Sequence, residues 1–168
     1  PEAGMPVMEG KAVLFKELGG INAVPICLDT QDTEEIIRTV VNIAPAFGGI
    51  NLEDISAPRC FEIEERLKEL LDIPVFHDDQ HGTAIIVLAG IINAMKVAGK
   101  DKETAQVVVN GAGSAGVAIT KLLLRYGFKH VTMCDINGML NESSPNLNWM
   151  QNEMVKVTNL EGRQGTLA

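Results

Sequence analysis

The sequence predicts an α/β fold in which short strands alternate with helices along the chain. Apolar, β-branched runs recur along it, segments with helical apolar spacing separate them, and a glycine-rich turn joins one such run to a helix. The length of 168 residues is enough for a real hydrophobic core. A content of 46% hydrophobic and 21% charged residues is ordinary for a globular protein.

In the first half, apolar residues at helical spacing predict helices, and short apolar runs predict strands. Pro25 favours an edge or irregular position for the first strand, and Pro45 ends the second helix. The expected helices are 11–18, closed by Gly19 and Gly20, then 32–45 and 61–72. The expected strands are 23–29, 48–52 and 73–77.

In the second half, residues 83–99 are apolar nearly all round, which predicts a buried helix. The runs 107–109 and 130–134 fit a parallel sheet that is buried on both faces. Because no further strand of this kind follows, we expect the sheet to be incomplete. The expected elements are strand 106–110, helix 114–126, strand 130–134 and a helix around 147–157.

Composition excludes several classes of partner. The net charge of −8 and the pI of about 4.8 disfavour binding to nucleic acid. No apolar run approaches the roughly 18–20 residues that span a membrane, so no membrane partner is expected. The cysteines Cys27, Cys60 and Cys134 are isolated and odd in number, which indicates a reducing, cytoplasmic location.

A G-x-G-x-x-G turn lies between strand 106–110 and helix 114–126, which is the setting of a dinucleotide site. Gly111 would make the tight turn, Gly113 would admit a pyrophosphate, and Gly116 would allow close packing. Asp135, about 20 residues further on, would bind a ribose 2′-hydroxyl and so favours NAD over NADP. The alternative is a purely structural turn. The expected cofactor-binding residues are Gly111, Ala112, Gly113, Ser114, Ala115, Gly116 and Asp135.

Carboxylates follow two of the short strands. Glu53 and Asp54 come after one, and Asp78 and Asp79 after the next. If these strands are parallel, both pairs emerge at the same edge, where open α/β sheets bind ligands. Converging carboxylates repel one another without a cation, and ligation by oxygen alone suits Mg²⁺ or Mn²⁺. The alternatives are a solvated loop for the first pair and helix capping for the second.

Three further polar residues are candidates for a site. His77 and His81 have the spacing of the H-E-x-x-H zinc motif, but Asp78 stands where that motif has glutamate. We therefore expect each histidine to be a polar neighbour of the site or a surface group. Lys11 is either an exposed helix lysine or, in a dry cleft near a metal, a general base with its pKa moved toward neutral.

Four stretches of the chain resemble malic enzymes, specifically the short prokaryotic-type malate oxidoreductases. They are GMPVMEGKAVLFKELGGINAVPICLDT, GGINLEDISAPRCFEIEERL, IPVFHDDQHGTA and NGAGSAGVAI. Together they cover about residues 4–140 in the order of the family. The resemblance implies oxidative decarboxylation of L-malate to pyruvate and CO₂, with reduction of NAD(P)⁺ and a requirement for Mg²⁺ or Mn²⁺.

Site residues are also implied by this similarity. Glu53, Asp54 and Asp79 match the metal ligands. Lys11 matches the lysine that takes the proton from the malate 2-hydroxyl, and Asp78 matches the aspartate beside it. The implied fold is the remainder of a substrate and metal domain with short parallel strands (1–77). It is followed by the first part of a Rossmann-like, doubly wound NAD(P)-binding domain (78–168).

The resemblance also leads us to expect a chain truncated at both ends. Family members carry a proton-donating tyrosine on a segment upstream of residue 1, which the single tyrosine, Tyr126, does not match. A malolactic-type decarboxylase, which keeps its cofactor bound, and a non-catalytic fragment that binds nucleotide or a partner chain remain alternatives. The expected partners are malate or pyruvate and, as in the family, a second subunit in a homodimer.

Overall fold

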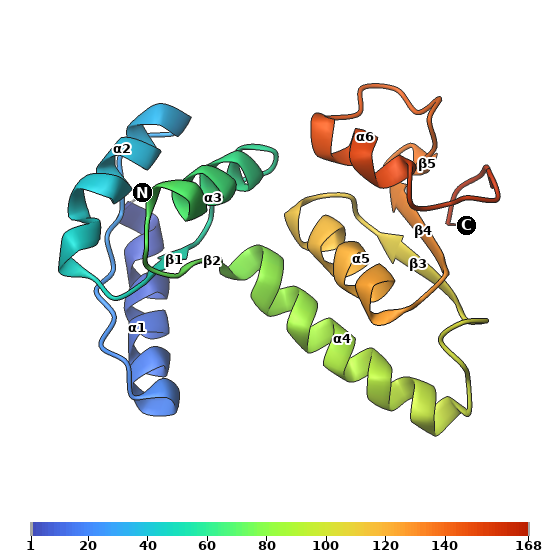
Figure 1. The fold of residues 1–168 in the computed structure, drawn as a ribbon, viewed down its shortest axis with the longest axis horizontal. Coiled ribbons are helices and arrows are strands. Elements are labelled where there is room, and N and C mark those ends of the chain that lie inside the picture. The colour runs from blue at the N-terminus through green and yellow to red at the C-terminus, as the bar shows by residue number, and fades with distance from the viewer. Residues whose placement is uncertain (1, 168) are drawn as a thin grey trace.

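The computed structural model describes residues 2–167 and has an α/β fold. The elements form two groups, and the long helix α4 leads from β2 of the first group along one side of the second (Figure 1). The helices are α1 (Met5–Gly19), α2 (Thr33–Ile43), α3 (Arg59–Leu70), α4 (Asp78–Ala98), α5 (Ser114–Tyr126) and α6 (Trp149–Val155), with 3-10 turns at Glu2–Gly4 and Ala44–Ala46. The strands are β1 (Ile50–Leu52), β2 (Val75–His77), β3 (Gln106–Asn110), β4 (His130–Asp135) and β5 (Gly138–Met139).

The first group is built around the parallel pair β1 and β2. Ile50 lies opposite Val75, and Leu52 lies opposite His77, so both strands end at the same edge. Helices α2 and α3 cover this pair with apolar side chains. The core residues are Ile36, Ile37, Val40, Leu52, Ile63, Leu67 and Val75. The carboxylate pairs 53–54 and 78–79 therefore start from one edge of one small sheet.

The second group has a three-stranded sheet in the order β3–β4–β5. β3 and β4 are parallel, whereas the two-residue β5 is antiparallel to β4. Helix α5 connects β3 to β4, and α4 packs along α5. Leu123, Phe128 and Val131 form the core here, with Leu88 and Ile91 of α4 packed against it.

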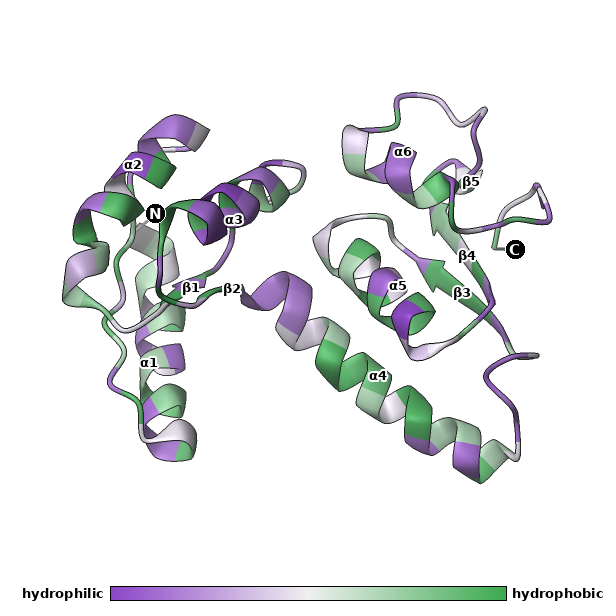
Figure 2. Cartoon of the chain, viewed as in Figure 1, coloured by the Kyte–Doolittle hydropathy of each residue, from purple (hydrophilic) through white to green (hydrophobic). Residues whose placement is uncertain are grey.

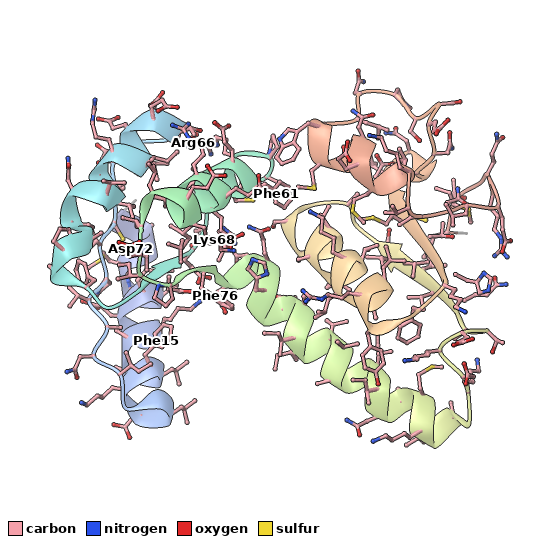
Figure 3. All side chains as sticks on the ribbon, in the orientation of Figure 1. Phe15, Phe61, Arg66, Lys68, Asp72 and Phe76 are labelled. Atoms are coloured by element: carbon pink, nitrogen blue, oxygen red, sulfur yellow. The ribbon has the colours of Figure 1, made fainter. Side chains whose placement is uncertain are left out.

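Helix α3 joins the two groups. Its Ile63 and Leu67 belong to the first core, whereas its Cys60 and Phe61 are buried against α5, β4 and α6. The Phe61 ring meets Trp149 of α6 edge to face, with 5.9 Å between the ring centroids and 83° between the ring planes (Figure 3). Helix α3 therefore contributes side chains to the cores of both groups.

The α/β class, the parallel pairing and most of the elements are confirmed by the structure. Strand β3 and helix α5 have the predicted bounds. Helices α1 and α4 begin at Met5 and Asp78, several residues before the predicted starts at 11 and 83, and the other confirmed elements differ by one or two residues at their ends. Helix α2 begins where Asp32 accepts a hydrogen bond from the Glu35 N–H, as an N-cap should.

The strand expected at 23–29 is wrong. Residues 20–28 have no regular secondary structure, and Val24 is 65% exposed. A strand needs a neighbour to satisfy its backbone, and no described strand lies beside this segment. Its apolar residues therefore do not mark a sheet.

The expectation of a parallel sheet buried on both faces is wrong for β3. This strand lies at the edge of the sheet and alternates between exposed and partly buried residues. The central strand β4 is buried along most of its length, as predicted. No third parallel strand follows among the described residues, and the sheet is instead extended by the two-residue, antiparallel β5.

The expectation of a buried helix at 83–99 is also wrong. Only Gln80 and Ala84 of α4 are buried, whereas Ile86 is 73% and Val97 92% exposed. Helix α5 covers one side of α4 and leaves much of its apolar surface open (Figure 2). With 21 residues and a mean hydropathy of 1.5, α4 reaches the length and composition of a membrane-crossing helix, contrary to expectation. One helix of this kind is weak evidence for a membrane span.

Candidate active site

Three carboxylates meet at the shared edge of β1 and β2. Glu53, Asp54 and Asp79 each offer an oxygen, and these oxygens lie within 4.8 Å of one another. Two come from the loop after β1 and one from the first turn of α4, so the parallel strand ends place them together. Hard oxygen donors of this kind suit Mg²⁺ or Mn²⁺, and the residues present fit such an ion.

The backbone at Asp54 adapts to this arrangement. Its φ of 56° lies in the left-handed region, which aspartate tolerates better than most residues. The Asp54 N–H donates a hydrogen bond of 3.1 Å to Asp79 Oδ2. The loop after β1 is therefore tied directly to the start of α4.

Lys11 of α1, which precedes these carboxylates in the chain, contacts the same cluster. Its ammonium donates hydrogen bonds to Glu53 Oε2 and, at 2.8 Å, to Asp78 Oδ2. Among the described residues of α1 none is buried, so this polar contact is the main tie between that helix and the site.

The charges of Lys11 and Glu53 respond to this packing in different ways. Burial disfavours the Lys11 ammonium, but its hydrogen bonds to Asp78 and Glu53 outweigh burial and raise the pKa of Lys11. Burial raises the pKa of Glu53, and repulsion from Asp79 and Asp78 adds to this, although Lys11 opposes it. The cluster contains more carboxylates than ammonium groups. The pKa of Lys11 is raised, so its ammonium stays protonated instead of having a pKa moved toward neutral.

His77 and His81 lie in different settings. His77, at the end of β2, is fully buried, and neither ring nitrogen has a hydrogen-bond partner among the described residues. Burial lowers the pKa of His77, so its ring is neutral. His81 is half-buried, and its Nε2 lies 2.7 Å from Glu64 Oε1.

Sequence patterns did not single out Glu64, Gln80 or Gly82. Glu64 of α3 is buried, and Gln80 Nε2 donates to it at 3.2 Å. A Cβ on Gly82 would lie 2.2 Å from Asp78 Oδ1, so the glycine leaves room for that carboxylate. The one local signal of this arrangement was Gly82 itself, because glycine is unfavourable inside a helix. Lys68 has the i,i+4 spacing of a helical Glu–Lys pair, but Gln80 and His81, the partners of Glu64 on α4, are remote in sequence and left no local signal.

A second concave site lies at the glycine turn. Its cavity has a volume of about 500 Å³. The lining residues come from the turn, the end of β4, α6 and the loop before α3. They are Ala57, Asn110, Gly111, Ala112, Gly113, Asp135, Ile136, Asn148 and Gln151. Ala57 follows the carboxylate loop closely, so this cavity and the carboxylate cluster share one connecting segment.

The turn has the close approach that a dinucleotide needs. A Cβ on Gly116 would lie 1.8 Å from the Gly111 carbonyl oxygen, whereas a Cβ on Gly113 would meet nothing within 4 Å. Helix α5 begins at Ser114, next to this open space. Asp135 lines the same cavity, and its Oδ1 accepts a hydrogen bond of 2.7 Å from the Asn137 N–H. These features fit a pyrophosphate at the helix N-terminus and a ribose beside Asp135.

Gln151 was not anticipated at this site. Its side chain donates a hydrogen bond of 3.2 Å to the Ala112 carbonyl, in the middle of the glycine turn. Gln151 also forms a capping box with Asn148 at the start of α6. Helix α6 therefore also contacts the glycine turn.

The chain matches two family profiles. The profile "Malic enzyme, NAD binding domain" matches residues 80–165, and "Malic enzyme, N-terminal domain" matches residues 2–35 and 30–68.

Individual relatives are similar over the whole chain. The chain is 58% identical to the "NAD-dependent malic enzyme" of Geobacillus stearothermophilus, over 100% of its own length and 35% of the relative. It is 55% identical to the "Bifunctional malic/malolactic enzyme" of Bacillus subtilis, over 99% of its length and 41% of the relative. The crystal structure of an NAD-dependent malic enzyme from Thermotoga maritima is 51% identical and superposes with a TM-score of 0.96, covering 99% of this chain and 45% of that one.

The chain thus spans less than half the length of these relatives. The dinucleotide-domain profile alone covers half of the chain, and the relatives agree with it over nearly every residue. The chain belongs to the malic enzyme family.

Proposed function

We propose that the chain is part of an enzyme that oxidatively decarboxylates L-malate. In this reaction NAD(P)⁺ takes a hydride from carbon 2 of malate, and pyruvate, CO₂ and NAD(P)H are formed. The observation that carries the proposal is the meeting of Glu53, Asp54 and Asp79 beside the Lys11–Asp78 pair. Residues 1–77 would serve substrate and metal, and residues 78–168 would serve the dinucleotide.

The carboxylate cluster supplies the metal ligands in this proposal. Glu53, Asp54 and Asp79 would hold Mg²⁺ or Mn²⁺, which when bound polarises the hydroxyl and adjacent carboxylate of malate. Support comes from the oxygen-only donor set and from the raised pKa of Glu53, to which burial contributes most and repulsion from Asp79 and Asp78 adds. A bound divalent cation would offset that repulsion.

Lys11 is the proposed general base. It has to be neutral to accept the proton of the malate 2-hydroxyl. With both Glu53 and Asp78 as partners its pKa is raised. If Glu53 bound a cation instead, Lys11 would lose one of these two partners, and the nearby positive charge would lower its pKa. Asp78 then stays as the partner that holds the ammonium formed by proton transfer.

The glycine turn and Asp135 are the proposed NAD site. The N-terminus of α5 would receive the pyrophosphate, Gly113 would leave room for it, and Asp135 would bind the ribose 2′-hydroxyl. A carboxylate there repels a 2′-phosphate, which favours NAD over NADP.

A malolactic reaction is the second candidate, since one relative is named as a bifunctional malic and malolactic enzyme. The same residues would serve both reactions. The two differ in their products, because malolactic conversion releases lactate and leaves no net NADH.

We also propose a cytoplasmic homodimer. Val13, Leu14 and Leu18 are exposed on α1, a helix with no buried residue among those described. Apolar surface of this kind favours burial against another subunit. Light scattering at increasing concentration tests the proposal, and a monomer throughout would contradict it.

The central test is calorimetric titration of the chain with Mn²⁺, followed by malate and NAD⁺, with product analysis. Saturable Mn²⁺ binding with net NADH supports the malic reaction. Lactate without net NADH supports the malolactic one. Binding of both ligands without turnover supports the non-catalytic alternative. Absence of Mn²⁺ binding overturns the metal site and the proposed function with it.

A further inference from the structure

Glu64 is a buried carboxylate that takes no part in the proposed chemistry. It lies in the middle of α3 and is only 4% exposed. Oε1 accepts hydrogen bonds from Lys68 Nζ at 2.8 Å and lies 2.7 Å from His81 Nε2, whereas Oε2 accepts from Gln80 Nε2 at 3.2 Å. Burial of a carboxylate is costly, and three donors offset that cost.

Two of these three donors belong to the first turn of α4. Gln80 and His81 directly follow Asp78 and Asp79. Consecutive helical residues are separated by a fixed rotation of about 100°. A contact that fixes the direction of Gln80 and His81 therefore also fixes the directions in which Asp78 and Asp79 leave the helix.

The same turn is held on its other side by the proposed site itself. Asp79 accepts from the Asp54 N–H, and Asp78 accepts from Lys11. Glu64 supplies the opposing contact from α3, whose Phe61 and Cys60 are buried in the other core. Lys68, the third donor and labelled in Figure 3, lies one turn further along α3 and is exposed.

We propose that Glu64 is a positioning residue for the metal site. Through Gln80 and His81 it sets the rotation and depth of the first turn of α4. In this way it presents Asp79 to Glu53 and Asp54, and Asp78 to Lys11. The side-chain hydrogen bonds of Glu64 go to Lys68, Gln80 and His81, and none joins it to a proposed metal ligand or to Lys11 among the described residues. The inference rests on the proposed function, because it needs a divalent ion at the carboxylate cluster.

A purely structural role for Glu64 makes a different prediction. If the network only stabilises the fold, its loss lowers the melting temperature and leaves the Mn²⁺ affinity of the folded chain unchanged. If it positions Asp79, the affinity of folded protein falls. Changes in groups that orient metal ligands typically weaken metal binding by about 10–100-fold.

The experiment compares Glu64→Leu, Glu64→Gln and the control Glu65→Leu, an exposed position on the same helix. Each variant is titrated with Mn²⁺ by electron paramagnetic resonance, and its melting temperature is measured. We expect Glu64→Leu to bind Mn²⁺ at least about tenfold more weakly, with an altered line shape at saturation. Glu64→Gln should recover most of the affinity, because Gln80 can reverse its amide and accept from the new NH₂ group. Glu65→Leu should behave like the wild type.

Folded Glu64→Leu with wild-type affinity and line shape overturns the positioning role. If Glu64→Leu does not fold, Gln80→Met is tested instead, because it removes one donor to Glu64 and keeps the volume of the side chain. Unchanged Mn²⁺ affinity in the Gln80 variant would also overturn the positioning role. A wild-type chain that binds no Mn²⁺ overturns the proposed function instead, and this inference with it.

Discussion

Lys11 Nζ lies 2.8 Å from Asp78 Oδ2, although 67 positions separate the two residues in the chain. The contact links α1, a helix without buried residues, to the first turn of α4. A lysine held between two carboxylates is well placed to exchange a proton with a substrate, and its charge also opposes the arrival of a cation nearby.

Replacement of Lys11 by alanine tests both roles of this lysine, as proton acceptor and as a charge that opposes cation binding. We expect malate oxidation to be lost, because the proton acceptor is removed. We expect Mn²⁺ binding to be unchanged or tighter, because a competing positive charge leaves Glu53. Calorimetry with Mn²⁺ and an assay of NADH formation measure the two effects. Lys16→Ala, in the same helix but bonded to Asn22, is the control and should change neither. Loss of Mn²⁺ binding in the Lys11 variant would contradict this account.

Replacement of Asp79 by alanine should abolish binding of the divalent ion. The change removes one of three ligand oxygens and also the acceptor of the Asp54 N–H. Because changes outside the ligand set already cost about 10–100-fold in affinity, a loss beyond about 100-fold is expected here. Calorimetric titration with Mn²⁺ measures it. Asp72→Ala, at an exposed position before β2, is the matched control. Unchanged affinity in the Asp79 variant would remove this residue from the site.

Two glycines of α4 provide a sharper pair of variants. A Cβ at Gly82 would lie 2.2 Å from Asp78 Oδ1, whereas a Cβ at Gly90 would meet nothing within 4 Å. Alanine is favoured over glycine in a helix by roughly 0.5–1 kcal/mol, so Gly90→Ala should stabilise the chain by about that amount. Gly82→Ala should displace Asp78 from Lys11 and reduce malate oxidation by about tenfold or more, without loss of folding. Urea unfolding and activity assays separate these outcomes, and equal behaviour of the two variants would refute the role of Gly82.

The sequence predicted the parts of the site that depend on local signals. The strand, glycine turn and helix at 106–126 agree with the structure because β-branched residues, glycines and helical spacing all act over a few residues. The convergence of residues 53–54 with 78–79 followed from one further step, since parallel strands bring their carboxyl ends to one edge.

The failures concern packing between remote segments. The apolar residues of 23–29 are compatible with a strand, but no described strand pairs with them. The apolar character of α4 could not reveal that α5 covers only one of its sides. The contacts of Glu64 with Gln80 and His81 join residues 16 and 17 positions apart, and no periodicity encodes them.

Gly116 should be the least replaceable residue of the glycine turn. An added Cβ would lie 1.8 Å from the Gly111 carbonyl oxygen, which belongs to the backbone and cannot turn aside. Overpacking typically costs about 1–3 kcal/mol, and a backbone clash of this kind should reach the upper end of that range. Gly116→Ala should therefore lower the free energy of unfolding by about 3 kcal/mol and abolish NAD⁺ binding. Gly10→Ala, in open space on α1, is the control. A stable variant that still binds NAD⁺ would show that the turn can open.

The buried thiol of Cys60 predicts how stability depends on pH in the alkaline range. Burial raises the pKa of Cys60 from 9.0 to about 11. The folded state therefore holds this proton more tightly than the unfolded state does. Its contribution to stability is present in full below pH 9 and is lost as the pH rises through 11. Since one pKa unit corresponds to about 1.4 kcal/mol, the loss is at most roughly 3 kcal/mol.

Urea unfolding of the wild type and of Cys60→Ala, at several pH values between 8 and 11, measures this contribution, with the range set by the pKa of Cys60. Lysine and tyrosine titration affects both proteins and cancels in the difference. The alanine variant lacks the thiol, so its stability should fall less steeply, and the gap between the two proteins should shrink as the pH rises. A gap that stays constant across this range would mean that Cys60 gains no protection from ionisation through its packing against Ala112 and Met133.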